Sequence, residues 1–287
     1  MSPLEELFSV RRILVALDPT MSGTGLLDTA VEFAHRVEAE LEGLFVEDVE
    51  LMRLAEHPFA HEVSLTGGLP KPLDLAAIER DWRALATGVR LSLEARAREM
   101  NVRCSFRVVR GRLEAEVRAA AAEADLVIMD WAGAALTRHV RLKTSAELPV
   151  AGPSGSVLLL HGRPAPIESI VVVCDDGPAT KRVLGAAARL RSRLRSEGTA
   201  PRLTVVCRDD SRAAAADSEN AARETLRDEG IDAVFRPLAG AGPEELADAL
   251  RTPANALLML PASLPLLSTD EGERLIADAE GPVLLVR

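Results

Sequence analysis

Short apolar runs that alternate with helical patterns constrain the fold of this chain more than any other feature. Residues 13–17, 44–46, 126–129 and 157–160 form unbroken apolar runs, and residues 102–109 alternate loosely between apolar and polar side chains. Unbroken runs of this length are typical of parallel strands that are covered on both faces. The segments between them space apolar residues three and four apart, as amphipathic helices do. Five strands alternating with helices predict a doubly wound α/β domain.

The same pattern begins again in the second part of the sequence. Apolar runs recur at residues 170–174, 203–206, 233–235, 256–260 and 283–286, again with helical or polar segments between them. The connection at residues 161–166 (HGRPAP) is short and stiff and has no apolar face to bury. A repeat of this kind predicts two tandem domains, which we place at residues 1–162 and 167–287, each with a five-stranded parallel sheet.

Composition narrows the class of partner and the compartment. The 287 residues carry a net charge of −10, which disfavours a broad surface for nucleic acid or for an anionic membrane. The three cysteines have no metal-binding spacing and indicate a reducing compartment. The first residues lack the basic region of a signal peptide, and no apolar run approaches the roughly 20 residues that cross a bilayer. We therefore expect a cytoplasmic protein without nucleic-acid or membrane partners.

The loop after residues 126–129 is the strongest candidate for a ligand site. It begins with Asp130 and Gly133, and nine residues later continues with Lys143 and Thr144. Open α/β sheets bind ligands at the carboxyl ends of their strands. A glycine lets backbone amides approach a phosphate, and a hydroxyl or a helix amino terminus supplies further donors. The arrangement predicts a loop suited to phosphate groups.

This spacing resembles the universal stress protein family. Its nucleotide-binding members have a glycine, two residues, a second glycine, nine residues, a third glycine and a serine or threonine after the fourth strand. Asp130 stands at the first glycine, Gly133 at the second, Lys143 at the third and Thr144 at the hydroxyl. The resemblance implies the strand order 3-2-1-4-5 in each domain. It also implies a site for ATP or AMP, with magnesium, in the first domain.

The resemblance extends to the adenosine end of that site. The family's binding members use an aspartate after the first strand and a valine in the second, and these positions are Asp18 and Val46 here. Asp130 brings like-charge repulsion to the phosphate end, and Lys143 brings a compensating contact. In the second copy Leu260 stands at the position of the first glycine, and Pro261 lacks an amide donor. We expect no nucleotide site there.

Three functional hypotheses follow. The first is a non-catalytic interaction and regulatory module of the universal stress protein type, with at most weak adenine nucleotide binding and an unidentified protein partner. The second is an ATP or AMP sensor. The third is an ATP-hydrolysing or adenylating enzyme, which the sequence disfavours because it has no P-loop, adenylation loop, nucleophile elbow or metal cluster. The family pairs domains through the fifth strand, so residues 157–160 and 283–286 are expected to join the two copies as an intramolecular pseudo-dimer; a homodimer is left open.

Two smaller groups of residues also bear chemistry. Cys174 and Cys207 end strands that we expect to be neighbours, which is compatible with a redox pair, although buried inert thiols are favoured. His57 and His61 have the spacing of two metal ligands on a helix, but the proline between them argues against that helix.

Overall fold

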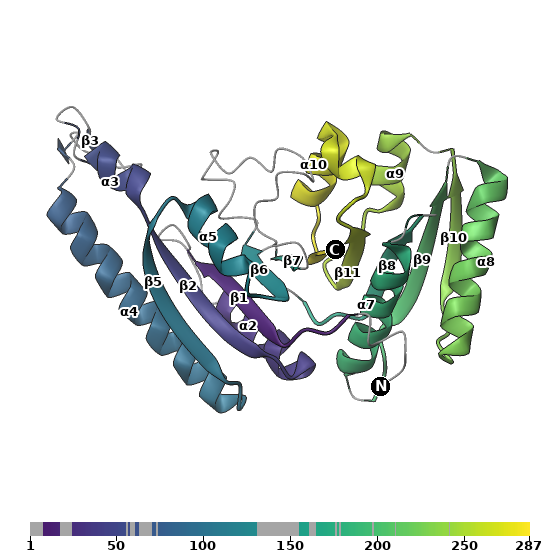
Figure 1. The fold of residues 1–287 in the computed structure, drawn as a ribbon, viewed down its shortest axis with the longest axis horizontal. Coiled ribbons are helices and arrows are strands. Elements are labelled where there is room, and N and C mark those ends of the chain that lie inside the picture. Colours follow the sequence, from purple (N-terminus) through teal and green to yellow (C-terminus); the bar gives the residue numbers. More distant parts are fainter. Residues whose placement is uncertain are drawn as a thin grey trace.

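A single ten-stranded sheet runs through the molecule. The computed structural model describes residues 8–17, 25–55, 57, 61–62, 71–72, 74–130, 155–160, 165–175, 177, 179–196, 198–209, 211–240 and 242–287. In it the strands lie in the order β10-β9-β8-β11-β12-β7-β6-β1-β2-β5 (Figure 1). We refer to residues 8–160 as the first half and to residues 165–287 as the second half.

Each half contributes five strands in the expected order. The first half contains β1 (Arg12–Leu17), β2 (Glu40–Asp48), β5 (Cys104–Gly111), β6 (Leu126–Asp130) and β7 (Ser156–Leu160), and the second half contains β8 (Ser169–Cys174), β9 (Arg202–Asp209), β10 (Val234–Ala239), β11 (Ala256–Pro261) and β12 (Val283–Val286). Within each half all neighbouring strands are parallel. The order 3-2-1-4-5 therefore holds in both halves.

The five-stranded parallel sheets predicted for the two tandem domains are continuous with each other and form one sheet. β7 and β12 pair antiparallel, with Leu158 opposite Leu284, and this pair joins the halves into one sheet. Both strands are buried along their whole length. An unpaired apolar edge would leave backbone donors and acceptors without partners, so pairing the two edges satisfies both at once.

Helices cover the two faces of the sheet. One face packs against α2 (Gly25–Val37), α4 (Leu75–Glu99), α7 (Thr180–Arg193) and α8 (Arg212–Asp228). The other packs against α5 (Leu113–Ala121), α9 (Pro243–Ala249), the 3-10 helix η1 (Pro265–Ser268) and α10 (Asp270–Ala277). The alternating side chains of the strands divide accordingly into two apolar cores, one on each face.

Local signals explain where several helices begin. Asp74 accepts a hydrogen bond from the N–H of Ala76 (3.0 Å) and caps α4, and Ser211 does the same for Ala214 (3.1 Å) at the start of α8. Beyond β2 lie the short helix α3 (Val49–Ala55) and a small hairpin of β3 (His61–Glu62) and β4 (Lys71–Pro72). Within the described ranges, none of the helices combines the length and the apolar character needed to cross a membrane.

Candidate functional site

The candidate site lies where the chain reverses direction across the sheet of the first half. β1 has β2 on one side and β6 on the other, with Ile13 opposite both Leu41 and Leu126. The strand order reverses at β1, and doubly wound sheets bind ligands at such switch points. Residues 18–24 and 131–154, which follow β1 and β6 in the sequence, lie outside the described residues. Asp18, Gly133, Lys143 and Thr144 belong to those segments.

The two remaining predicted residues, Val46 and Asp130, lie at this same edge. Val46 is fully buried near the end of β2, in the apolar core that also contains Leu44 and Val117. Asp130 is the last residue of β6, is partly buried and lies opposite Leu160 in the register of the sheet. β1 runs between the strands that carry them. The fold therefore brings Val46 and Asp130 to the carboxyl ends of strands on either side of β1.

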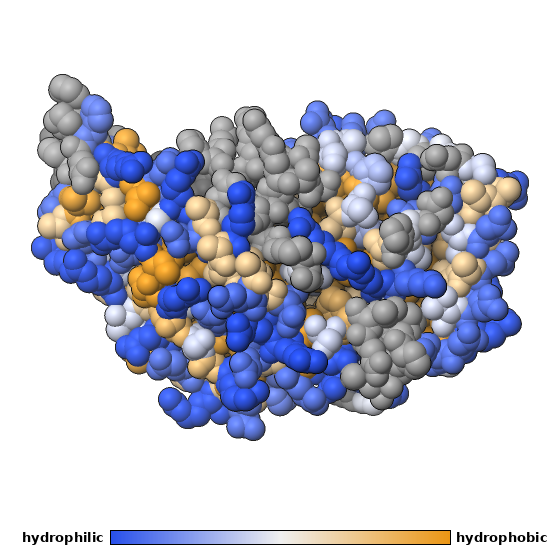
Figure 2. Space-filling view, viewed as in Figure 1, coloured by the Kyte–Doolittle hydropathy of each residue, from blue (hydrophilic) through white to orange (hydrophobic). Residues whose placement is uncertain are grey.

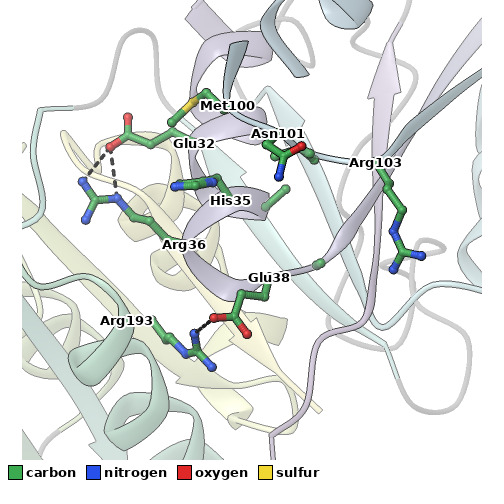
Figure 3. Close-up of a pocket in the computed structure, with 11 residues that line it drawn as sticks. Glu32, His35, Arg36, Glu38, Met100, Asn101, Arg103 and Arg193 are labelled. Atoms are coloured by element: carbon green, nitrogen blue, oxygen red, sulfur yellow. Dashed lines mark hydrogen bonds and ion pairs between the residues drawn. The ribbon is translucent and has the colours of Figure 1, made fainter. Parts of the chain in front are cut away.

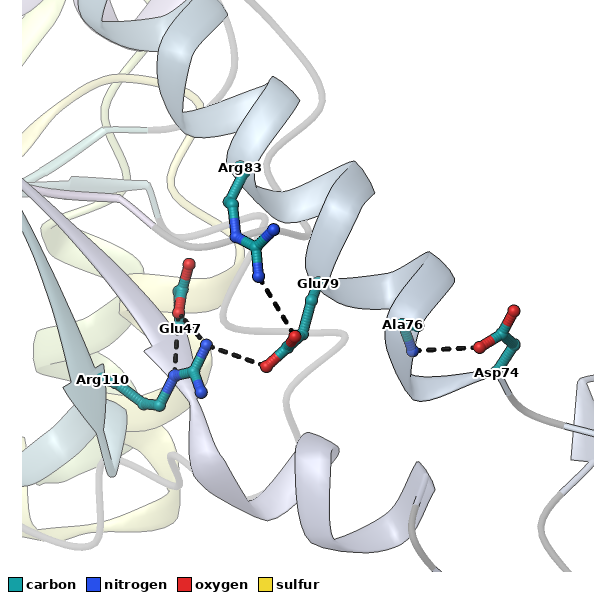
Figure 4. Close-up of polar contacts among 6 residues, drawn as sticks. All are labelled: Glu47, Asp74, Ala76, Glu79, Arg83 and Arg110. Atoms are coloured by element: carbon teal, nitrogen blue, oxygen red, sulfur yellow. Dashed lines mark hydrogen bonds and ion pairs between the residues drawn. The ribbon is translucent and has the colours of Figure 1, made fainter.

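A charged network borders this edge on the side of α4. Glu47 follows Val46, is only 7% exposed and accepts a hydrogen bond from Nε of Arg110 on β5 (3.0 Å), whose Nη2 forms an ion pair with the same carboxylate oxygen (2.9 Å). Arg110 also pairs with Glu79 of α4 (3.1 Å), which in turn pairs with Arg83 (3.2 Å; Figure 4). The hydrogen bond to Glu47 raises the pKa of Arg110 above its ordinary value. The buried carboxylate is thus compensated and adds no isolated negative charge to the site.

Sequence reasoning missed this network, although a signal for it exists. Glu47 and Arg110 are direct register partners near the ends of two neighbouring strands, so an acid and an arginine at these places predict a cross-strand pair. The contribution of Glu79 has no such signal, because it depends on how α4 packs over the sheet.

The equivalent place in the second half is closed by its own residues. Asp175 follows β8 as Asp18 follows β1, and its Oδ1 accepts hydrogen bonds from the N–H of Gly177 (2.9 Å) and the hydroxyl of Thr180 (3.1 Å). The Thr180 hydroxyl also lies 2.6 Å from the carbonyl oxygen of Asp175. This carboxylate is therefore used to hold the turn that leads into α7.

Apolar side chains fill the position after β11, where the first half has its candidate phosphate loop. Leu264, Leu266 and Leu267 are all at most 5% exposed and pack into the core on the α10 face. The N–H of Ala262 donates to the carbonyl of Val286 (2.8 Å) and fixes the start of the segment against β12. We call residues 262–267 the apolar plug. The described residues that directly follow β11 therefore form no glycine-rich cradle.

A groove of about 760 Å³ lies at the opposite end of the sheet, near the amino ends of β2 and β5 (Figure 3). Glu38 and Asn101 line it, and both have left-handed backbone angles (φ 59° and 55°) where α2 and α4 end. Glu38 pairs with Arg193 of the second half, and this hydrogen bond lowers the pKa of Glu38. Arg36 pairs with Glu32 (2.8 Å) and donates to the carbonyl of Arg195 (3.2 Å). The contacts of Glu38 with Arg193 and of Arg36 with Arg195 join the two halves, so we assign the groove a structural role.

The cysteines on β8 and β9 are direct neighbours in register, as the sequence predicts for adjacent strands. Cys174 and Cys207 are both fully buried. Burial raises the pKa of Cys207 to about 11 and raises the pKa of Cys174 well above its ordinary value. A raised pKa keeps a thiol protonated and unreactive, which favours the interpretation as inert core residues. Among the residues that the structure describes, no three histidine, cysteine or carboxylate side chains gather as a metal site would require.

Comparison with solved structures identifies the fold class as that of the universal stress proteins. A universal stress protein from Archaeoglobus fulgidus DSM 4304 matches with a TM-score of 0.64 and 13% identity, covering 98% of each chain. A putative universal stress protein from Pseudomonas aeruginosa UCBPP-PA14 matches with a TM-score of 0.51 and 16% identity, covering 99% of this chain and 95% of the other. The cytoplasmic domain of a prokaryotic cation chloride cotransporter matches with a TM-score of 0.54 and 12% identity, covering 97% of this chain and 95% of the other.

At these identities the likeness shows the shared fold, and it confirms at that level the resemblance found in the sequence. No model of a known protein family matches the chain, and no curated protein sequence matches it either.

Proposed function

We propose that this chain is a non-catalytic interaction and regulatory module of the universal stress protein type, built from two tandem domains and acting in a stress response. Its adenine nucleotide binding is at most weak and is confined to the first half. The asymmetry between the halves carries this proposal. In the second half the apolar plug and the turn around Asp175 occupy the place of a nucleotide site.

The residues of the first half support weak binding. Asp130 stands at the end of β6, where the family's binding members have a glycine beside the phosphates. A carboxylate there repels a triphosphate. Its side chain also keeps the backbone amides farther from the phosphates than a glycine would. Val46 is fully buried near the end of β2 and belongs to the apolar core beneath this edge of the sheet. The sensor hypothesis is the second candidate, because the fold brings Val46 and Asp130 to one edge of the sheet.

A thermal shift assay separates the two candidates. We expect 1 mM ATP or AMP, with magnesium, to raise the Tm of the wild-type protein by only about 1 °C, since a ligand at its Kd adds about 0.4 kcal/mol. A sensor with ligand at 100 times Kd would gain about 2.7 kcal/mol and several degrees. A shift of that size would replace our proposal with the sensor hypothesis, and nucleotide turnover that Asp130→Ala abolishes would replace it with the enzyme.

Substitutions at Asp130 sharpen the same assay. We expect Asp130→Asn to increase the shift caused by ATP but not by adenosine, because it removes the charge and keeps the size. Asp130→Gly should increase the ATP-induced Tm shift further, because a glycine lets backbone amides approach the phosphate groups. Lys143→Ala should weaken ATP more than adenosine. Glu123→Gln is the matched control, because Glu123 is an exposed carboxylate before the amino end of the same strand. Equal responses to ATP and adenosine in all variants would show that no phosphate lies near these residues.

A further inference from the structure

The two outer edges of the ten-stranded sheet differ in whether another strand can add to them. At β10 the N–H of Gly240 donates to the carbonyl of Asp209 (2.9 Å), and Ala239 is the register partner of Asp209. In a parallel pair, the N–H and C=O groups of successive residues point alternately toward and away from the neighbouring strand. The N–H of Gly240 points toward β9, so the backbone groups of Phe235, Pro237 and Ala239 point outward. Pro237 has no N–H, and the guanidinium of Arg223 lies 4.1 Å from the centre of the Phe235 ring. This edge is therefore poorly suited to a further strand.

The opposite edge, β5, has no such obstruction in the described structure. β5 pairs with β2 in an unbroken register from Cys104 to Gly111, and the N–H of Leu41 donates to the carbonyl of Arg103 (2.9 Å). By the same alternation, the N–H and C=O groups of Cys104, Phe106, Val108 and Arg110 point away from β2. None of these is a proline, and no other described strand pairs with this side of β5.

The side chains of β5 give its two faces different chemistry. Phe106 packs toward α4 with the apolar core on that face, and Val108, on the same side, is 47% exposed. Figure 2 shows apolar surface in this region, at the left of the view. On the other face Arg103 and Arg107 pair with Glu40 (2.7 Å) and Glu42 (3.1 Å) of β2 on their inner side. Their side chains remain 83% and 50% exposed.

We propose that the outer edge of β5 binds, by strand addition, an extended segment of a partner protein in which acidic and apolar residues alternate. An added strand has a side-chain period of two, so its apolar residues would lie beside Phe106 and Val108 while its carboxylates lie beside Arg103 and Arg107. Main-chain hydrogen bonds to Phe106 and Val108 would supply affinity, and the arginines would supply selectivity.

A second copy of this chain fits the edge less well. Directly opposite residues of an antiparallel pair share a face, so two β5 strands paired about Arg107 would place the Arg107 side chains of both copies opposite each other. Arg107 is a half-exposed cation. Like charges directly opposite each other destabilise a strand pair. Acidic residues of a different protein avoid this repulsion.

The binding test uses the whole chain and a fluorescein-labelled eight-residue peptide of alternating glutamate and valine, followed by anisotropy at low salt. We expect this peptide to bind at least tenfold more tightly than one of alternating lysine and valine. A glutamate–valine peptide N-methylated at every second residue, on its hydrogen-bonding edge, should lose binding by at least tenfold. Equal binding of the methylated peptide would overturn strand addition, and equal binding of the lysine peptide would overturn the charge assignment.

Two variants place the binding on β5. Val108→Pro removes an outward N–H without breaking the ladder to β2 and should abolish binding, whereas Val108→Thr keeps the N–H and a branched side chain and should bind as the wild type does. If Val108→Pro lowers the Tm, Arg103→Glu provides the second variant and should shift the preference toward the lysine peptide. Undiminished binding of the glutamate–valine peptide by Val108→Pro, or by Arg103→Glu if Val108→Pro does not stay folded, would overturn the proposal. A wild-type dimer that Val108→Pro dissociates would also overturn it.

This inference rests on the interaction role proposed above, but its outcome is separate from that of the nucleotide test. We expect 1 mM ATP to leave the peptide's Kd unchanged, because β5 lies two strands from β1 and its outer edge faces away from the candidate site.

Discussion

At the residue scale, burial decides the chemistry of the cysteines. Neighbouring strands place Cys174 beside Cys207, which is the geometry that a sequence-based redox hypothesis requires. Their environment opposes it, because desolvation raises both pKa values and disfavours the reactive thiolate. The register follows from the apolar pattern of the two strands, whereas the degree of burial depends on α7 and α8, which pack over them.

Titration of the thiols in the native protein tests whether Cys174 and Cys207 are unreactive. With the pKa of Cys207 near 11, its thiolate fraction at pH 8 is about one thousandth, so its reaction with a disulfide reagent should be slow. We expect only Cys104, which is partly exposed, to react within minutes in the native protein, and all three thiols to react in denaturant. Cys104→Ser should leave no fast-reacting thiol. A fast thiol in that variant, or a disulfide in the purified native protein, would contradict the inert interpretation.

At the scale of elements, the strands were predictable and the apolar plug was not. Every apolar run identified in the sequence coincides with a strand, although the run at residues 233–235 begins one residue before β10, because parallel strands covered on both faces leave that pattern. The sequence after β11 indicates only a loop without glycines. Leu264, Leu266 and Leu267 fold back through a single 3-10 turn, which is too short to show a period. The second half's lack of a cradle was foreseeable, but what replaces it was not.

The plug depends on close contact between η1 and α10. A Cβ on Gly272 would lie 2.0 Å from the carbonyl oxygen of Leu266, and a backbone atom has little room to move. Gly272→Ala should therefore destabilise the protein by about 1–3 kcal/mol. Gly88→Ala is the matched control, because Gly88 lies inside α4 with nothing within 4 Å of its Cβ position, and there alanine should stabilise by about 0.5–1 kcal/mol. Denaturant unfolding measures both, and equal effects would show that α10 does not hold the plug.

At the scale of the whole molecule, the repeated apolar pattern predicts the content of each half, and only the family resemblance predicts that residues 157–160 and 283–286 join them. The apolar runs of β7 and β12 do not by themselves specify a neighbouring strand. The structure pairs them edge to edge and adds the contact between Glu38 and Arg193. The candidate site shows the same limit. Its strand-borne residues, Val46 and Asp130, follow from the strand pattern, but the charged network around Glu47 depends on packing between elements.

Because the two halves share one sheet, we expect the protein to unfold in a single transition. Both tryptophans, Trp82 and Trp131, belong to the first half, so their fluorescence reports that half alone, whereas far-ultraviolet circular dichroism reports both. We expect the two signals to give the same midpoint in denaturant. Leu284→Ala, at the buried junction in the second half, should cost about 2–5 kcal/mol and should lower the fluorescence midpoint as well.

Val234→Ala is the control for that variant, because Val234 is 54% exposed on the outer strand of the second half and its truncation should move neither signal appreciably. If Leu284→Ala lowered only the dichroism midpoint, or if the wild-type transitions were separate, the halves would be independent domains whose sheets merely touch. A common midpoint means instead that pairing of β7 with β12 couples the halves, because loss of packing on one side of the junction then destabilises strands on both sides.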